Sequence, residues 1–314
     1  MNCFLGIDTS NYTTSCALAD ESGTVILSLR RLLEVKPGER GLRQSDALFA
    51  HIKNLPGLLA QLRSEVPDAT VTAVGVSDRP RSLPDSYMPV FLAGVSAAQA
   101  SASAAGVPLY RFSHQQGHIA AALYGSGAEN EIAGNEFISF HVSGGTTEVL
   151  KVTLNGGVPD AELIGGTADL NAGQAIDRTG VAMRLGFPAG AELDRLALAC
   201  EGPAAKVRPA VRGLECNLSG IENVTAKMIA EGRAPEQTAA YLFEYIAQTL
   251  RALAENAREK YGRLPVLFAG GVMSSVYISQ RLKSLGDVYF APSEYSADNA
   301  AGIALLCRKR HIYQ

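Results

Sequence analysis

The chain has 314 residues, of which 47% are hydrophobic and 19% charged, and its formal net charge is −3. This composition is typical of a globular protein large enough for two lobes, and it excludes an intrinsically disordered chain. No uncharged apolar run is long enough to span a bilayer, and the first residues lack the basic region and apolar core of a signal peptide. The charge gives no sign of a strong basic field for nucleic acid. The five cysteines include no C-x-x-C pair, so we expect reduced thiols in a cytoplasmic protein.

The chain begins with an expected strand–turn–strand meander. Residues 4–10 form a buried strand that carries Asp8 and Ser10 at its polar end, and residues 15–19 and 24–29 supply two further strands. Such a hairpin can offer hydroxyls and backbone N–H groups to a phosphate, with Asp8 near its magnesium. It can equally be an ordinary hairpin whose hydroxyl side chains bond to their own backbone.

Helical and strand patterns alternate after this meander. Apolar residues at helical spacing predict a helix over residues 45–63, which we expect Pro56 to kink or divide. Residues 71–77 form a short buried strand, and residues 90–105 a helix rich in Ala and Ser. The strand at residues 107–112 then leads into a segment that contains two histidines.

His114 and His118 are two of only five histidines in the chain. If the segment is helical, a spacing of four puts both imidazoles on one face, about one turn apart. Neutral imidazole is a favoured ligand for zinc and iron, and two such ligands leave room for a third and for an open coordination position. Asp298, before a predicted helix at residues 300–308, is the best candidate for the third ligand. The alternatives are two histidines without a ligand and an acid that caps the helix.

The strand–turn–strand pattern returns in the second half of the chain. Residues 137–142 and 148–154 are predicted strands on either side of a glycine–hydroxyl turn at residues 143–147. Two such units about half a chain apart indicate a duplicated architecture. Glycines let the backbone approach a phosphate closely, and the two threonines of the turn add donors.

Four helical segments follow this second meander, one of which starts at residues 217–220. The helix expected at residues 171–185 contains Asp177, and the helix expected at residues 191–200 contains Asp194. Taken singly, these acids are more typical of a helix surface than of a site. Residues 234–260 have the apolar stripe of a long amphipathic core helix.

A Gly-Gly turn ends the last predicted core strand. The strand at residues 265–269 runs into Gly270 and Gly271, and a helix follows. Bare backbone of this kind lets an adenine or a ribose lie against the chain. The same turn can also serve only to let the strand and the helix pack closely, and the residues alone leave both interpretations open.

The short motifs of this chain occur together in the order and near the spacing of one known family. They resemble the TsaD-type transferases, which make threonylcarbamoyladenosine in tRNA and were once catalogued as glycoprotein endopeptidases. The resemblance runs essentially end to end, and although each motif is short, the ordered set is specific. The motifs lie at residues 6–10, 114–118, 142–147, 175–179, 188–190, 193–197, 218–220, 269–272 and 298–299.

The resemblance implies a fold as well as an activity. The expected fold is α/β: the two-lobed actin-like ATPase (ASKHA, ribonuclease H-like) fold, with duplicated mixed sheets and flanking helices. The expected lobes are residues 1–110, joined by the C-terminal helix at residues 299–314, and residues 111–298. The second lobe is expected to carry the metal and nucleotide sites.

The resemblance also implies roles for single residues. Asp8 and Ser10 take catalytic positions, and His114, His118 and Asp298 resemble the ligands of one iron or zinc ion. The expected cofactor is ATP or an acyl-adenylate, with magnesium as a further candidate cation. In the family the donor's acyl group lies at the metal and the adenosine amine attacks it. The residues expected to hold the adenylate are His141, Val142, Ser143, Gly144, Gly145, Asp177, Gly190, Asp194, Gly270, Gly271 and Ser275.

The chain departs from the family pattern in one stretch and at two single positions. Residues 8–14 read D-T-S-N-Y-T-T where the family has a sequence close to E-T-S-C-D-E-T, so two acids are replaced. Thr146 stands where the family usually has histidine, and Ser275 stands where it has asparagine. These changes leave the predicted metal ligands intact but remove charge and donors from the cleft. They therefore bear on the acyl acceptor.

The first interpretation is a metal-dependent (threonyl)carbamoyl transferase that acts on adenosine of tRNA or on a related acceptor. The second is a non-catalytic nucleotide-binding paralog that works beside TsaB-like or other subunits of a tRNA threonylcarbamoylation complex, and a carbamoyltransferase for a small-molecule acceptor is a further alternative. A kinase of the same fold leaves the histidines unexplained. An endopeptidase has the least support, because the H-x-x-x-H of this chain lacks the glutamate base of H-E-x-x-H. We expect no membrane partner, and we expect a poor replacement for a regular tRNA-modifying synthase.

Overall fold

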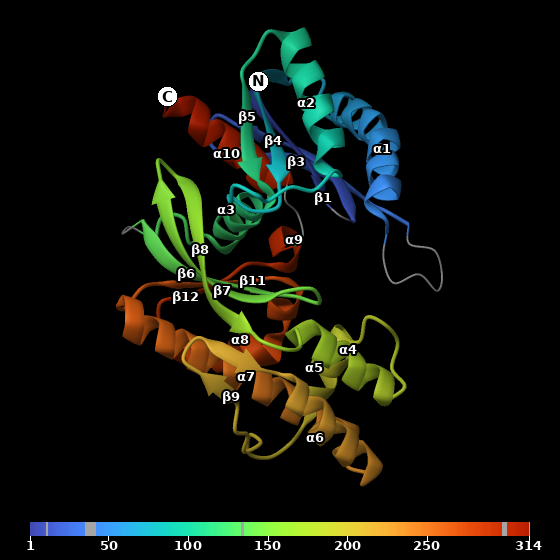
Figure 1. Cartoon of the computed structure of the whole chain (residues 1–314), viewed down its shortest axis with the longest axis vertical. Coiled ribbons are helices and arrows are strands. Elements are labelled where there is room, and N and C mark those ends of the chain that lie inside the picture. Colours follow the sequence, from blue (N-terminus) through green and yellow to red (C-terminus); the bar gives the residue numbers. More distant parts are fainter. Residues whose placement is uncertain (11, 35–41, 133–134, 297–299, 314) are drawn as a thin grey trace. The chain divides into compact units, whose positions relative to one another are not determined.

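The computed structural model describes residues 1–10, 12–34, 42–132, 135–296 and 300–313 (Figure 1). The chain divides into two compact units. Unit 1 comprises Met1–Gly125, Thr153–Ala161 and Ala297–Gln314, and unit 2 comprises Ser126–Val152 and Glu162–Ser296. The sequence places the first lobe boundary after residue 110, whereas the compact units separate after Gly125. The helix that carries His114 and His118 therefore belongs to unit 1.

Unit 1 is built on a five-stranded mixed sheet in the order β3-β2-β1-β4-β5. β1, β4 and β5 run parallel, while β1, β2 and β3 form an antiparallel meander, as the sequence predicts for the first 30 or so residues. The strands are β1 (Asn2–Ser10), β2 (Thr13–Asp20), β3 (Val25–Leu32), β4 (Thr70–Arg79) and β5 (Leu109–Ser113).

Helices cover both faces of this sheet. Side chains of β1 alternate between the faces, so that Leu5 and Ile7 join the core beneath α1 and α2, whereas Phe4 joins the core beneath α10. Pro56 lies inside α1 without dividing it, contrary to one of the two outcomes expected for that residue. The helices are α1 (Gln44–Glu65), α2 (Phe91–Ala105), α3 (His114–Ser126) and α10 (Ala300–Ile312).

Two glycines let α10 approach its neighbours at backbone distance. A Cβ atom at Gly6 would overlap the backbone of α10 at Ala300 and Ala304. A Cβ atom at Gly302 would overlap the backbone of Gly117 in α3. Because α3 is fixed to α10 in this way, it packs as part of unit 1, which explains why the compact unit extends beyond residue 110.

Unit 2 is built on a seven-stranded sheet in the order β12-β11-β6-β7-β8-β10-β9. The run β8-β7-β6-β11-β12 repeats the strand order of unit 1, with β6, β11 and β12 parallel, and β10 and β9 extend it beyond β8. This repeated order confirms the predicted duplication. The strands are β6 (Glu136–Val142), β7 (Thr147–Asn155), β8 (Val158–Thr167), β9 (Ala210–Arg212), β10 (Glu215–Asn217), β11 (Val266–Ala269) and β12 (Val288–Phe290).

The long helix α7 supplies much of the core of unit 2. It begins with Pro235, and proline is well suited to this position because an N–H in the first turn would have no partner within the helix. Arg258 and Lys260 lie in its last turn, where positive charges interact favourably with the helix dipole. No helix within the described ranges is long and apolar enough to cross a membrane. The helices of this unit are α4 (Ala172–Ala182), α5 (Gly190–Ala199), α6 (Ser219–Ala230), α7 (Pro235–Tyr261), η1 (Gly271–Ser274), α8 (Val276–Leu282), η2 (Lys283–Leu285) and α9 (Ser293–Ser296).

Candidate functional site

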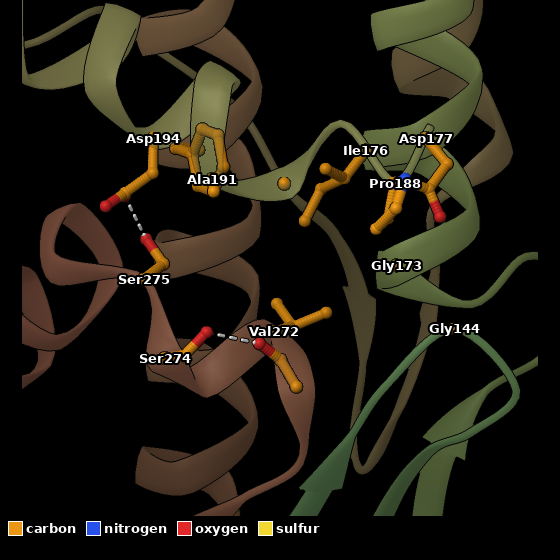
Figure 2. A pocket seen from close by; sticks show the side chains of 13 residues that line it. Gly144, Gly173, Ile176, Asp177, Pro188, Ala191, Asp194, Val272, Ser274 and Ser275 are labelled. Carbon is orange, nitrogen blue, oxygen red and sulfur yellow. Dashed lines mark hydrogen bonds between the residues drawn. The ribbon is translucent and has the colours of Figure 1, made fainter. Parts of the chain in front are cut away.

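A cavity of about 470 Å³ opens in unit 2 where the turn after β6, the start of α4, helix α5 and the turn after β11 meet (Figure 2). Its volume falls in the range of small-molecule sites. The wall is mainly apolar, with two carboxylates and two hydroxyls. It is formed by Gly144, Gly173, Ile176, Asp177, Pro188, Gly190, Ala191, Asp194, Phe243, Gly271, Val272, Ser274 and Ser275.

The turn after β6 is closed by its own serine and docked on the start of α4. Ser143 Oγ accepts hydrogen bonds from the N–H groups of Gly145 (3.3 Å) and Thr146 (3.1 Å), and Ser143 O accepts one from Gly173 N (3.1 Å). A Cβ atom at Gly173 would lie 2.7 Å from Gly144, so the contact between helix and turn requires glycine there. A Cβ atom at Gly144 would meet nothing within 4 Å. The turn therefore presents bare backbone to open space.

Asp177 projects from α4 at one wall of the cavity. Its Oδ1 accepts a hydrogen bond from Ala189 N (3.0 Å), which holds the chain that leads into α5. No bond to Asp177 Oδ2 is found among the described residues. A carboxylate oxygen beside a cavity of this kind can accept the hydroxyl of a ribose.

Asp194 and Ser275 are hydrogen-bonded to each other at the opposite wall. Ser275 Oγ donates to Asp194 Oδ1 (2.5 Å), and the backbone N–H groups of Val276 and Tyr277 also donate to this carboxylate, at 3.1 and 3.2 Å. Ser275 Oγ in turn accepts from Ile278 N (3.1 Å) as the N-cap of α8. Asp194 thus anchors the N-terminus of α8, a role that its position on a helix surface did not predict.

The apolar lining was not predicted as part of the site. Ile176 and Pro188 lie on one side of the cavity and Val272 on another (Figure 2), and Phe243 contributes from α7. Ile176, Pro188 and Val272 lie within two residues of predicted site positions. Their place in the cavity could therefore have been inferred from the neighbouring motifs. Phe243 lies in a helix whose pattern indicated only core.

The structure brings together six of the predicted adenylate-binding residues in this cavity, while the other five do not line it. Val142 is fully buried in the core, His141 is half-buried in β6, and Ser143 and Gly145 lie in the turn. Gly270 has a φ of 102°, and a Cβ atom there would overlap the backbone of Val142. The first glycine of the Gly-Gly turn therefore serves close packing. The six that line the cavity are Gly144, Asp177, Gly190, Asp194, Gly271 and Ser275.

Unit 1 contains a buried polar cluster around Asp8. This carboxylate is 1% exposed, and it accepts hydrogen bonds from the Ser77 hydroxyl and from Ser10 N (3.3 Å), while its Oδ1 lies 3.0 Å from Nδ1 of His114. Burial raises the pKa of Asp8, but His114 and the hydrogen bonds from Ser77 and Ser10 lower it by more, so the net pKa lies below its ordinary value. Asp8 is therefore an ionised, buried acceptor, and Ser10 contributes its backbone N–H to it.

The two histidines of the predicted metal site lie together on α3. Their ring centroids are 4.5 Å apart, with planes at 71°. Because the Asp8 carboxylate is ionised and can only accept, Nδ1 of His114 is the donor in this contact. Such an arrangement fits a divalent ion bound by imidazoles, one of them oriented by a carboxylate. Asp298, the predicted third ligand, lies outside the described residues, and within those residues no group of three or more metal-ligating side chains is found.

Two threonines beside the first turn, Thr9 in β1 and Thr14 in β2, bond to neighbouring helices. Thr9 Oγ1 accepts from Gly94 N (3.1 Å) and donates to Val90 O (3.2 Å), which ties β1 to α2. Thr14 Oγ1 contacts Nδ1 of His51 at 2.8 Å beneath α1. These two hydroxyls therefore bond to distant elements, Thr9 to the start of α2 and Thr14 to α1, and not to the hairpin's own backbone as one alternative expected. Asn11, one of the residues that depart from the family pattern, lies outside the described residues.

One family model matches most of the chain. The family described as TsaD, tRNA N6-adenosine threonylcarbamoyltransferase, matches residues 40–305. This range includes every residue of the cavity in unit 2 and both histidines of α3, but it leaves out β1 with Asp8 and Ser10.

Solved structures of other proteins share the fold. The chain is similar to component A of (R)-2-hydroxyglutaryl-CoA dehydratase from Acidaminococcus fermentans, at 14% identity and a TM-score of 0.58, covering 99% of this chain and 100% of that one. It is also similar to the activator of 2-hydroxyisocaproyl-CoA dehydratase from Clostridium difficile, whose structure has bound ADPNP. The identity is 12% and the TM-score 0.55, and the match covers 98% of this chain and 95% of that one. The chain is also similar to full-length HypF, at 12% identity and a TM-score of 0.62, and the match covers 98% of this chain but 55% of HypF. These matches, with two mixed sheets of repeated order, confirm the predicted actin-like ATPase fold.

Proposed function

Because the chain belongs to the TsaD family of tRNA N6-adenosine threonylcarbamoyltransferases, we propose that it is a metal-dependent (threonyl)carbamoyl transferase. Its donor is a carbamoyl-adenylate, and its acceptor is adenosine of tRNA or a related group. The observation that carries this proposal is the cavity of unit 2, in which six residues predicted to hold an adenylate line one space of nucleotide-site size.

Each part of an adenylate has a matching part of the cavity. The base fits the apolar surface of Ile176, Pro188 and Val272, and a ribose hydroxyl can donate to the second oxygen of Asp177. The phosphate fits the bare backbone at Gly144, where no side chain keeps it at a distance. These residues bind and orient the donor, and positioning of this kind is a large part of the catalysis of group transfer.

The metal belongs to the same proposal. His114 and His118 would hold it, with Asp298 as the third ligand, and iron and zinc both suit this donor set. When bound, the ion supplies a Lewis acid for the donor's acyl carbonyl or a phosphate oxygen. Asp8 acts on His114 as a positioning residue: its carboxylate contacts Nδ1 and so orients the ring.

A second function is favoured by the substitution at residue 275. Where the family has asparagine, the Ser275 hydroxyl donates to Asp194 and caps α8, so this position offers a ligand little beyond what α8 already uses. That loss of a donor supports a changed acceptor: a small molecule in place of tRNA, or no acceptor at all in a nucleotide-binding partner of a threonylcarbamoylation complex. A TsaB-like or other subunit would supply the tRNA contacts in the complex.

Complementation distinguishes these functions. The chain is expressed in a strain depleted of its own synthase, and tRNA nucleosides are measured by mass spectrometry, with the metal content of the purified protein and of His118→Ala determined in parallel. Metal loss in the variant together with little threonylcarbamoyladenosine supports the transferase with a changed acceptor. Full restoration establishes the plain family activity. Equal metal content in both proteins contradicts the metal-dependent mechanism and leaves the binding partner.

A further inference from the structure

A second cavity, of about 340 Å³, lies in unit 2 between the end of α5, the start of α7 and the side of α8. It shares no lining residue with the cavity described above. Its polar groups include two arginines, Arg233 and Arg281, together with Gln237 at the start of α7. Tyr241 and Met228 contribute apolar surface. Arginine is the side chain best suited to planar recognition of carboxylates and phosphates.

Arg281 is held in place by a buried carboxylate. Its Nε donates to Glu244 Oε2 (2.8 Å), and its Nη2 donates to the Tyr277 hydroxyl (3.0 Å), which itself donates to Glu244 Oε2 (3.0 Å). The guanidinium also lies 4.5 Å from the centre of the Tyr277 ring. Both the direction and the plane of the guanidinium are thus fixed before any ligand arrives, which reduces the entropy lost on binding.

Glu244 stays ionised despite its burial. It is 3% exposed, and its Oε1 accepts a further hydrogen bond from Gln248 Nε2 (2.7 Å). Burial raises the pKa of Glu244, but the hydrogen bonds from Arg281, Gln248 and Tyr277 lower it by more. The buried Glu244 is thus paired with an arginine that is itself partly exposed at the cavity, so the carboxylate holds Arg281 in place without removing it from the cavity surface.

Arg281 retains a donor for a ligand. Its Nε and Nη2 are used within the cluster, no bond to Nη1 is found among the described residues, and its side chain is 35% exposed where it lines the cavity. Arg233, at the same cavity, is 58% exposed and only 3.6 Å from the exposed Glu231, a pair that water screens strongly. Glu201 also lines the cavity, but it is exposed, so its repulsion of an anion is screened as well.

We propose that this cavity is a binding site for a small organic anion, with a carboxylate or phosphate headgroup against Arg281 and Arg233 and an apolar body against Tyr241 and Met228. The volume suits a free metabolite-sized molecule. The proposal does not depend on the transferase function, because it uses a different set of residues.

Titration with phenyl phosphate, phenylacetate and the neutral 2-phenylethanol tests the proposal on the full chain. Calorimetry should show saturable binding of at least one anion. The anion that binds with the higher affinity shows whether the site prefers a phosphate or a carboxylate headgroup. The neutral probe should bind about tenfold or more weakly, since it lacks the charge-assisted hydrogen bonds. The double variant Arg281→Gln/Glu244→Gln, which leaves no buried charge unpaired, should weaken anion binding about tenfold or more.

Two further variants locate the probe. Arg195→Gln removes an exposed arginine of α5 that pairs with Glu192 outside the cavity, so anion binding should be unchanged. Gly144→Val narrows the other cavity and should also leave the anion bound. No saturable binding of either anion, undiminished binding by a folded double variant, or loss of binding in Gly144→Val would each overturn the proposal.

Discussion

The carboxylate of Asp8, at the end of β1, lies 3.0 Å from Nδ1 of His114, the first residue of α3, across 106 positions of sequence. The carboxylate is buried and ionised, and the Ser77 hydroxyl and Ser10 N hold it from other directions. An imidazole bound in this way has its ring orientation and its proton fixed. The end of β1 therefore sets the orientation of a side chain on α3 through this contact.

Asp8→Asn should weaken metal binding by about 10- to 100-fold, the usual effect of losing an orienting carboxylate beside a histidine ligand. Asparagine keeps the volume of aspartate but has no charge to hold the proton on Nδ1. The affinity is measured by competition between the protein and a chelator for Zn²⁺ and for Co²⁺, whose visible spectrum also reports the coordination.

Asp46→Asn is the matched control for Asp8→Asn. Asp46 is an exposed acid in the first turn of α1, so its loss should leave the metal affinity unchanged. A folded Asp8→Asn protein that binds both ions as tightly as the native protein would show that Asp8 does not position a ligand.

Gly144→Val should weaken ATP binding by about tenfold or more, equivalent to at least ~1.4 kcal/mol. A Cβ atom at this position meets nothing within 4 Å, so the fold tolerates the side chain, which then occupies the space proposed for the phosphate. Calorimetric titration with ATP is the measurement. Gly57→Val, on the exposed face of α1, also adds its side chain in open space and should change nothing. Equal ATP affinities in the two variants would show that the nucleotide does not bind in this cavity.

Glu244→Ala should lower the free energy of unfolding by about 3 kcal/mol, the lower end for breaking a buried ion pair, because Arg281 is about a third exposed. The change leaves Arg281 and the Tyr277 hydroxyl without their shared acceptor. Urea denaturation followed by circular dichroism measures the loss. Glu192→Ala breaks an exposed pair with Arg195 and should have no measurable effect. Similar midpoints for both variants would contradict the importance of the buried cluster.

The unfolding free energy should fall as the pH decreases from about 7 to 5, by about 2 kcal/mol from His51 alone. His51 is fully buried, and burial lowers its pKa from 6.5 to about 4 even though Asp8 acts in the opposite direction. Between these two values the unfolded chain binds a proton that the folded chain does not, so stability rises with pH across this window. Urea denaturation at several pH values measures it.

His51→Leu should flatten that dependence. Leucine fills a similar space without a titrating group, although it removes the contact between Nδ1 and Thr14 and so lowers stability at every pH. The slope between pH 5 and 7 is therefore the informative quantity, and the absolute free energy is not. An unchanged slope in His51→Leu would assign the pH dependence to other groups.

Many strands and helices follow from the residue pattern, because alternation and helical spacing are local properties, but β8 and the short strands β9, β10 and β12 were not predicted. The amphipathic stripe of residues 234–260 became α7, and the repeated strand–turn–strand pattern became two sheets with the same strand order. The unit boundary was less predictable. Helix α3 packs on α10 through contacts such as that of Gly117 with Gly302, which lie far apart in the sequence and which no local pattern predicts.

The candidate site was predictable for residues that belong to short motifs and not for residues that only pack beside them. Asp177 and Gly144 could be identified from motifs, whereas Phe243 enters the cavity from a core helix. The same limit applies to roles. Sequence placed Asp194 among ligand-binding residues, but its capping of α8 depends on Ser275, Val276 and Tyr277, 81 to 83 positions away.

Helix α8 connects the two cavities described above, because its N-cap Ser275 lines the first and its own side chains line the second. Its first N–H groups bind Asp194 in one cavity, while the side chains of Tyr277 and Arg281 line the other, and the helix is only seven residues long. Thermodynamic reciprocity then sets a quantitative rule: whatever factor an anion at Arg281 applies to the nucleotide's dissociation constant, the nucleotide applies to the anion's. Measuring the dissociation constant of each ligand in the presence of the other would therefore give the coupling free energy between the two cavities.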